Sequence, residues 1–148
     1  MKRLMLLFCV WALLGACPGW AEDQDIGGLR KVKGSASIER TGQVMAAKPG
    51  MPIRQNDVLV TGPDGSLGVI FKDNTTISLG PDSRLVVSEF VFKPEQKEFS
   101  FIIKMIKGTA SYLTGIIGKL SPESVKFKTP KATVGIRGTK FLVKVDPD

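Results

Sequence analysis

The chain has 148 residues, a length that favours one domain, and its 21 Lys and Arg against 14 Asp and Glu give a formal net charge of +7. The sequence contains no histidine, which excludes Ser-His-Asp constellations and removes the usual general base and the commonest metal ligand. It therefore predicts no catalytic residues, no metal site and no cofactor.

The first residues have the pattern of a secretory signal peptide. Residues 1–3 are positively charged, residues 4–14 are apolar but too few to span a bilayer as a stable helix, and an acidic segment begins at Glu22. We interpret 1–21 as the signal peptide, 22–29 as a short linker and 30–148 as one domain. No transmembrane helix is expected after processing.

Two processing sites fit this leader. Cleavage after Ala21, with Gly19 two residues before it, gives a soluble product. Residues 13–17 resemble a lipobox, and cleavage there would leave Cys17 as a lipidated N-terminus, although Pro18 directly after the cysteine favours the soluble product. Both routes predict a periplasmic or secreted protein, anchored at Cys17 in the second case. No cysteine follows Cys17, so the exported domain is expected to fold without disulfides.

From residue 32 onward the chain has the pattern of short strands separated by turns. Large apolar residues recur at every second position, most clearly over 67–71 and 99–105, as in strands with one buried face. Turn sequences recur roughly every 8–12 residues. They are Thr41-Gly42, 48–52, 62–65, Asp73-Asn74, 80–83 and Gly108. This spacing predicts an all-β domain, either a small β-solenoid or β-helix-like stack of short strands, which we favour, or a sandwich. One short helix is expected over 114–120.

Four carboxylates could in principle pair for glycoside hydrolysis. Each of them, Asp57, Asp64, Asp73 and Asp82, lies in a turn sequence, where aspartate is favoured because its side chain bonds nearby backbone N–H groups. No D-x-[DN]-x-[DN]-G calcium loop is present. We therefore expect these residues to shape turns rather than to catalyse a reaction.

The segment 129–143, TPKATVGIRGTKFLV, alternates like a strand but carries an arginine followed by Gly-Thr. Val134, an apolar residue before Gly138, has an even number, and Phe141, an apolar residue after it, has an odd number. In a regular strand the two would point to opposite faces. Burial of both requires a slip of one residue, which we place as a bulge at Gly138. Arg137 would then project from the opposite face or bond the groups of a turn.

Lysines are concentrated in the second part of the chain. Residues 22–92 carry 8 Lys and Arg against 9 Asp and Glu, whereas residues 93–148 carry 11 against 5. Lysines on a strand face commonly guard against edge-to-edge pairing. They also suit an anionic partner such as an envelope glycan phosphate, a lipid or an acidic protein. The residues expected to contact such a partner are Lys126, Lys128, Lys131 and Lys140. The export signal argues against nucleic acid.

Taken in order, these segments resemble the FecR domain, a periplasmic module. The matching stretches are 56–61 (NDVLVT), 65–75 (GSLGVIFKDNT), 77–85 (ISLGPDSRL) and 129–143, within a resemblance that runs from Gly34 to Val143. The resemblance implies an all-β, solenoid-like envelope domain that binds other proteins and is not an enzyme. The residues that match its motifs, in a structural or partner-binding role, are Asp57, Thr61, Asp73, Pro81, Ser83, Thr129, Pro130, Arg137, Gly138, Thr139 and Phe141.

In complete regulators of this kind, the domain carries a signal from an outer-membrane receptor to a sigma factor. This sequence shows no cytoplasmic helical segment of that kind, so we do not carry the anti-sigma role over. We expect a scaffold in envelope sensing that binds a receptor, a sensor or a second copy through an open strand edge at Leu142 and Val143. The alternative is an envelope binder of anionic glycan or lipid through the basic residues 93–148.

Overall fold

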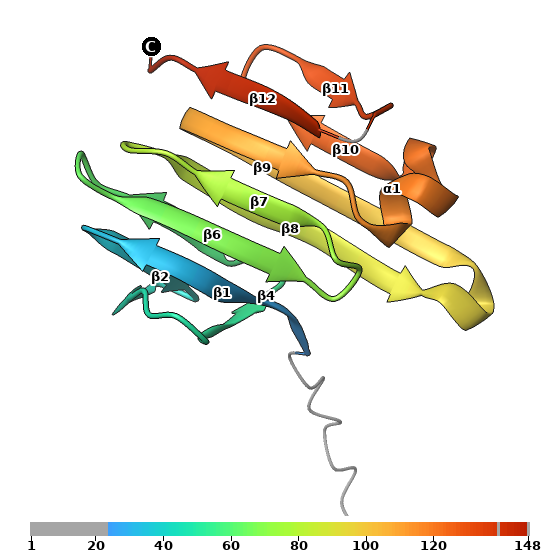
Figure 1. The fold of residues 1–148 in the computed structure, drawn as a ribbon, viewed down its shortest axis with the longest axis horizontal. Helices are drawn as coiled ribbons and strands as arrows, with labels where there is room; N and C mark the ends of the chain where they lie inside the picture. The colour runs from blue at the N-terminus through green and yellow to red at the C-terminus, as the bar shows by residue number, and fades with distance from the viewer. Residues whose placement is uncertain (1–23, 139, 148) are drawn as a thin grey trace, which may run out of the picture.

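The computed structural model describes residues 24–138 and 140–147 (Figure 1). In this part of the chain the fold is all-β, as expected, and its strands join one 12-stranded sheet. The strand order along the sheet is β3-β2-β5-β8-β9-β7-β6-β1-β4, and β10, β11 and β12 attach beside β9. Neighbours are antiparallel except β9 and β10, which run parallel.

The strands and helices follow one another in the order β1 (Asp25–Lys33), β2 (Ala36–Arg40), β3 (Gln43–Ala46), β4 (Pro52–Arg54), β5 (Val58–Thr61), β6 (Ser66–Phe71), β7 (Thr76–Leu79), β8 (Arg84–Lys93), η1 (Pro94–Gln96), β9 (Glu98–Leu113), α1 (Ile116–Leu120), η2 (Pro122–Ser124), β10 (Val125–Lys128), β11 (Thr133–Gly135) and β12 (Lys140–Val145).

Two of the expected turns close tight hairpins. Thr41 and Gly42 have φ angles of 48° and 79° and join β2 to β3, which is the left-handed pair that a two-residue hairpin requires. Asn74, with φ of 65°, lies between β6 and β7. Asparagine adopts this conformation at low cost, so the turn predicted at 73–74 is confirmed.

The longest strand, β9, joins the two halves of the curled sheet. Its residues 98–107 pair with β8, whereas residues 108–113 pair with β12 and, from Ala110 onward, with β7. We call β2, β3, β5, β8, β10, β11 and 98–107 the β8 half, and β1, β4, β6, β7, β12 and 108–113 the β6 half. Figure 1 shows β1, β6 and β7 in front of β2 and β8.

Gly108 bends β9 where the chain passes between the halves. Before Gly108 the buried residues of β9, such as Met105, have odd numbers, whereas after it the buried residues, such as Ala110, have even numbers. Gly108 itself has φ of 95°. The expected turn at Gly108 is therefore wrong, because the strand continues through it. A left-handed residue inside a strand reverses which side chains point inward without ending the strand.

One apolar core lies between the two halves. Phe71 of the β6 half contacts Phe101 of the β8 half at a ring-centroid distance of 4.8 Å, and Phe90 packs on both rings at 5.7 and 5.1 Å. Leu59 and Ile103 are among the fully buried aliphatic side chains. Each such burial contributes about 1.5–3 kcal/mol, so the core is large enough to stabilise the fold without disulfides.

The finer expectation of a β-solenoid is not confirmed. The strands form an antiparallel, curled half-barrel, and turn spacing alone does not distinguish this arrangement from stacked rungs. The expected helix is confirmed as α1. The structure places residues 25–29 in β1, with Ile26 and Leu29 buried, although 22–29 was expected to be a linker. The expected signal peptide, 1–21, lies outside the described residues.

Candidate functional site

Asp57 is buried and fastens β2 to the turn between β4 and β5. Its carboxylate accepts hydrogen bonds from Arg40 Nε at 2.8 Å and Nη2 at 2.7 Å, and from the backbone N–H of Arg54 at 2.8 Å. Arg40 also donates to the carbonyl of Pro52 at 3.0 Å. Because a bidentate arginine and a backbone donor occupy both oxygens, Asp57 is built as a structural anchor.

Asp73 is equally buried and organises the start of α1. Its carboxylate accepts from the Thr75 hydroxyl at 2.7 Å and from the backbone N–H groups of Thr75 and Ile117 at 3.0 and 3.3 Å. Its carbonyl accepts from the N–H of Ile116 at 2.7 Å. A carboxylate in this position satisfies donors that the first turn of a helix leaves unpaired. Gly115 allows the close approach, since a Cβ there would lie 2.3 Å from the Asp73 carbonyl oxygen.

Thr61 and Ser83 hold a third turn against β9. The Thr61 hydroxyl donates to the carbonyl of Gly80 at 2.7 Å and accepts from the N–H of Ser83 at 2.9 Å. The Ser83 hydroxyl accepts from the N–H of Thr109 at 3.0 Å and lies 3.1 Å from the carbonyl of Pro81. Pro81 itself is exposed. The buried motif residues therefore bond to the turns around them, and the backbone supplies most of their partners.

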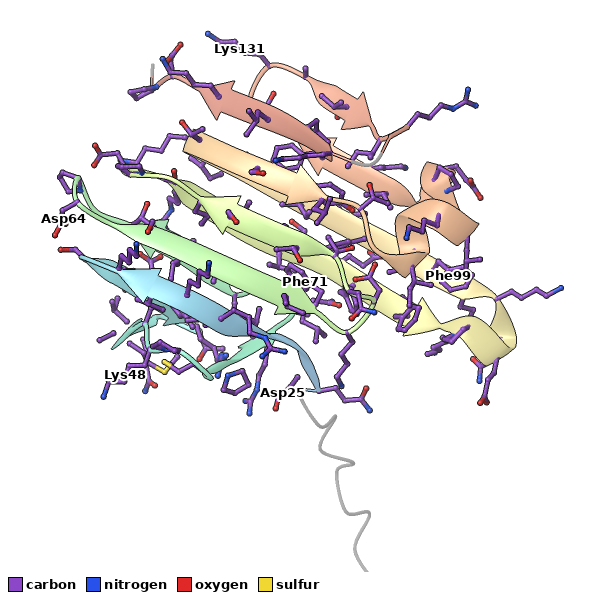
Figure 2. The ribbon with its side chains drawn as sticks, viewed as in Figure 1. Asp25, Lys48, Asp64, Phe71, Phe99 and Lys131 are labelled. Atoms are coloured by element: carbon purple, nitrogen blue, oxygen red, sulfur yellow. The ribbon has the colours of Figure 1, made fainter. Side chains whose placement is uncertain are left out.

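The four turn carboxylates differ in their surroundings. Asp57 and Asp73 are committed to the bonds above, and Asp64 and Asp82 are exposed. A hydrogen bond from Ser35 holds the pKa of Asp64 below its ordinary value. Figure 2 shows Asp64 at the tip of the turn that precedes β6. No group of three or more Asp, Glu, His or Cys side chains that could hold a metal occurs in the described part of the chain.

Tyr112 is a buried polar residue that sequence reasoning treated only as part of a strand. Its hydroxyl has no hydrogen-bond partner among the described residues. Burial raises the pKa of Tyr112 to about 12, and the Asp73 charge supports this rise. The Thr75 hydroxyl opposes it, but that hydroxyl donates its proton to Asp73 at 2.7 Å and not to Tyr112. The ring stacks on Phe141 at 5.0 Å, and Phe141 meets Phe127 edge to face at 5.5 Å. Phe141 thus packs β12 onto the core.

Arg137 and Gly138 lie in the connection between β11 and β12, two strands that belong to different halves of the sheet. Gly138 has φ of 146°, and its carbonyl accepts from the Thr114 hydroxyl at 2.6 Å. The expected bulge inside one strand is wrong. The buried residues change from even to odd numbers because β11 pairs with β10, whereas β12 pairs with a different strand, β9. Ile136 is buried, whereas Val134 is 40% exposed.

Among the described motif residues of the segment 129–143, Pro130 and Arg137 are exposed and Thr129 is half-buried. Thr129 closes the loop between β10 and β11 through bonds with Ala132 of 2.8–3.1 Å, and Pro130 is exposed at its tip. Arg137 is exposed as well. Thr139 and the alternative lipidation residue Cys17 lie outside the described residues.

The four lysines expected to form an anionic-partner surface are split by the fold. Lys126 and Lys128 share the outer face of β10, whereas Lys131 lies in the loop after it and Lys140 is on β12 in the other half. Lys104 of β9 lies directly beside Lys128. Sequence reasoning missed Lys104, although its place between the buried Ile103 and Met105 indicated that it points outward.

The edge strand β12 provides the second exposed surface. It pairs with β9 from Lys140 to Val145, and no other strand of the described residues pairs with it. Leu142 is 72% exposed on its outer face, between Lys140 and Lys144. The edge expected near Leu142 and Val143 is therefore present in the described structure.

The buried turn anchors lie in a region that matches a known family. The family model described as FecR protein matches residues 57–148, more than half of the chain. The chain belongs to the FecR family. No curated protein and no solved structure matches it significantly. The matched region begins at Asp57 and includes Asp73, Ser83 and Gly138.

FecR membership connects the chain in general terms with signalling at the cell envelope. No helix in the described residues is long and apolar enough to cross a bilayer. Within the matched region the buried residues Asp57, Asp73 and Ser83 anchor turns, whereas Pro81, Pro130, Arg137 and Gly138 are exposed.

Proposed function

We propose that this chain is an exported, non-enzymatic FecR-family module that binds another envelope protein in sensing or signal transduction. The observation that carries the proposal is the edge of β12. This strand leaves one side of its backbone unpaired within the described residues, and it displays Leu142 between two lysines. An unpaired edge of this length can accept a strand from a partner.

The side chains of the edge favour a selective partner. Lys140 and Lys144 are exposed, and like charges repel a second copy aligned in the same way, which limits indiscriminate pairing. A strand with carboxylates at alternate positions would instead pair with Lys140, compete with Asp146 for Lys144, and cover Leu142. A receptor or sensor segment with an acidic, alternating sequence fits these requirements.

The proposal of a non-enzymatic role is supported by the chemistry of the side chains. The sequence has no histidine, and the two buried aspartates at 57 and 73 are fully engaged in structural hydrogen bonds. A general base needs a free lone pair within reach of substrate, which neither carboxylate offers in this arrangement.

The test is a crosslinked capture from cell envelopes, with the tagged chain expressed in its own host. Leu142→Lys is compared with Val44→Lys, a matched control on the edge strand β3, because Val44 is 69% exposed and the charge change is the same. We expect the wild type and the control to capture one stoichiometric protein and Leu142→Lys to lose it at least about tenfold.

Equal capture by Leu142→Lys and wild type would overturn the assignment to β12. Mass spectrometry of the same sample reads the mature N-terminus. A product that starts at Glu22 or at a lipidated Cys17 supports export, and an intact Met1 in the captured protein contradicts it. Thermal melting of both variants verifies that each is folded.

A further inference from the structure

Three lysines form a cluster on the outer face of the β8 half, which we call the lysine face: Lys104, Lys126 and Lys128. Lys104 and Lys128 are direct neighbours on the parallel strands β9 and β10, and Lys126 is two residues before Lys128 on the same face. Strand spacing places the first pair about 5 Å apart at the backbone and the second about 7 Å apart. The three ammonium groups therefore reach one area of surface from two strands.

The lysine face takes part in no ion pair within the described part of the chain. None of its three side chains makes an ion pair or a side-chain hydrogen bond with a described residue. The neighbouring Arg84 is bound by Glu39 through two hydrogen bonds, and Lys93 is paired with Glu98 at 3.0 Å. Glu89 lies two strands away from Lys126, about 10 Å at the backbone, with Ile102 between them.

The chemistry of lysine points to phosphate groups. An ammonium is a compact point charge with three donors that rotate to suit phosphate oxygens, whereas the fork of arginine recognises carboxylate and phosphate alike. The unpaired cations of this cluster are all lysines. The arginine next to them is already occupied by Glu39. Lysine pairs with carboxylates as well, as Lys93 does with Glu98, so the preference for a lipid surface rests on the aliphatic side chains that lie among these lysines.

The shape of the lysine face favours an extended surface over a small soluble anion. Its lysines stand on the adjacent strands β9 and β10, and Val86, Ile102 and Ile106 lie half-buried among them on β8 and β9. Exposed cations alternating with aliphatic side chains suit the boundary between lipid headgroups and acyl chains.

We propose that the lysine face docks this domain on the phosphate headgroups of an anionic phospholipid membrane in the cell envelope. Each lysine close to such a surface strengthens binding about fivefold, so the three together contribute on the order of a hundredfold. The interaction is electrostatic and exposed, and it therefore weakens as salt shortens the Debye length. It is independent of the edge of β12, which belongs to the other half of the sheet.

The test is co-sedimentation of the protein, purified from the envelope in its mature form, with vesicles of equal parts phosphatidylglycerol and phosphatidylcholine. Vesicles of phosphatidylcholine alone measure any contribution of the N-terminal segment. The variant K104Q/K126Q/K128Q removes the cluster. The matched control K31Q/K33Q/K48Q removes the same charge from three exposed lysines of β1 and the loop before β4. Figure 2 shows Lys48 at the opposite end of the molecule from Lys131, and Lys131 lies in the loop that follows β10.

We expect the wild type and the control to bind the anionic vesicles at low salt, and K104Q/K126Q/K128Q to bind about a hundredfold more weakly. Leu142→Lys, which alters the edge of β12, should bind the vesicles like the wild type. The vesicle assay therefore remains valid even if β12 proves not to bind a partner protein. Equal loss in both triple variants would show a general charge effect and overturn the proposal. Binding to soluble polyphosphate without binding to vesicles would overturn the lipid as the source of phosphate.

Discussion

Removal of the Tyr112 hydroxyl should stabilise the protein. The Tyr112→Phe substitution keeps the ring that stacks on Phe141 at 5.0 Å and faces Phe101 at 6.4 Å. It deletes an oxygen that is fully buried and has no partner among the described residues. An unsatisfied buried polar group costs about 1–3 kcal/mol. We expect Tyr112→Phe to raise the free energy of unfolding by about 1 kcal/mol near neutral pH.

The stabilisation by Tyr112→Phe should increase in alkaline solution. The phenol ionises near 10.0 in the unfolded chain, and burial raises the pKa to about 12 in the folded protein. Ionisation therefore favours the unfolded state once the pH exceeds 10, and it has no effect on stability well below that value. At pH 11 the wild type should have lost about 1.4 kcal/mol through this group, which Tyr112→Phe cannot lose.

Urea denaturation followed by far-ultraviolet circular dichroism at pH 8 and pH 11 measures both effects. Tyr112 is the only tyrosine of the sequence, so tyrosinate absorbance in the folded protein reports its pKa directly. The lysines titrate in the same range but are common to both proteins, and the difference between variant and wild type cancels them. A loss of 1 kcal/mol or more at pH 8 would show that the hydroxyl is bonded and would refute the reasoning.

Two further substitutions test the turn anchors and the bend by the same denaturation assay. Arg40→Met leaves the buried Asp57 carboxylate without its bidentate partner and should lower the free energy of unfolding by about 3 kcal/mol. The double variant Arg40→Met/Asp57→Asn should be at least about 1 kcal/mol more stable than Arg40→Met alone. An additive double variant would contradict a coupled pair. Gly108→Ala should cost about 3 kcal/mol, because φ is 95° and a Cβ would lie 2.2 Å from Ser83 Oγ. Gly135→Ala, with nothing within 4 Å of its Cβ, should change stability by less than about 0.5 kcal/mol; equal costs at the two glycines would refute this explanation.

Local patterns predicted the strands well, because alternation and turn chemistry depend on neighbours in the chain. The alternation over 99–105 predicted the buried face that Phe101, Ile103 and Met105 form. Asn74 was expected in a tight turn and has the left-handed conformation that such a turn requires.

Where the same local reasoning failed, a longer contact had decided the outcome. A glycine in a strand pattern is compatible with a turn, a bulge or a bend. Gly108 became a bend because Ser83, from the turn before β8, packs against it, and the Ser83 hydroxyl accepts the N–H of Thr109. Gly138 lies in a connection because β11 and β12 have different neighbours.

The sequence by itself determined the all-β class, most of the turns and the family, since these depend on residue types at short spacing. The tertiary structure decided which distant residues meet. It placed Asp73 at the start of α1 and Lys104 beside Lys128, through pairings that no local pattern encodes. The physical reason is that strand partners are selected by burial of their common apolar face, which involves the whole core at once.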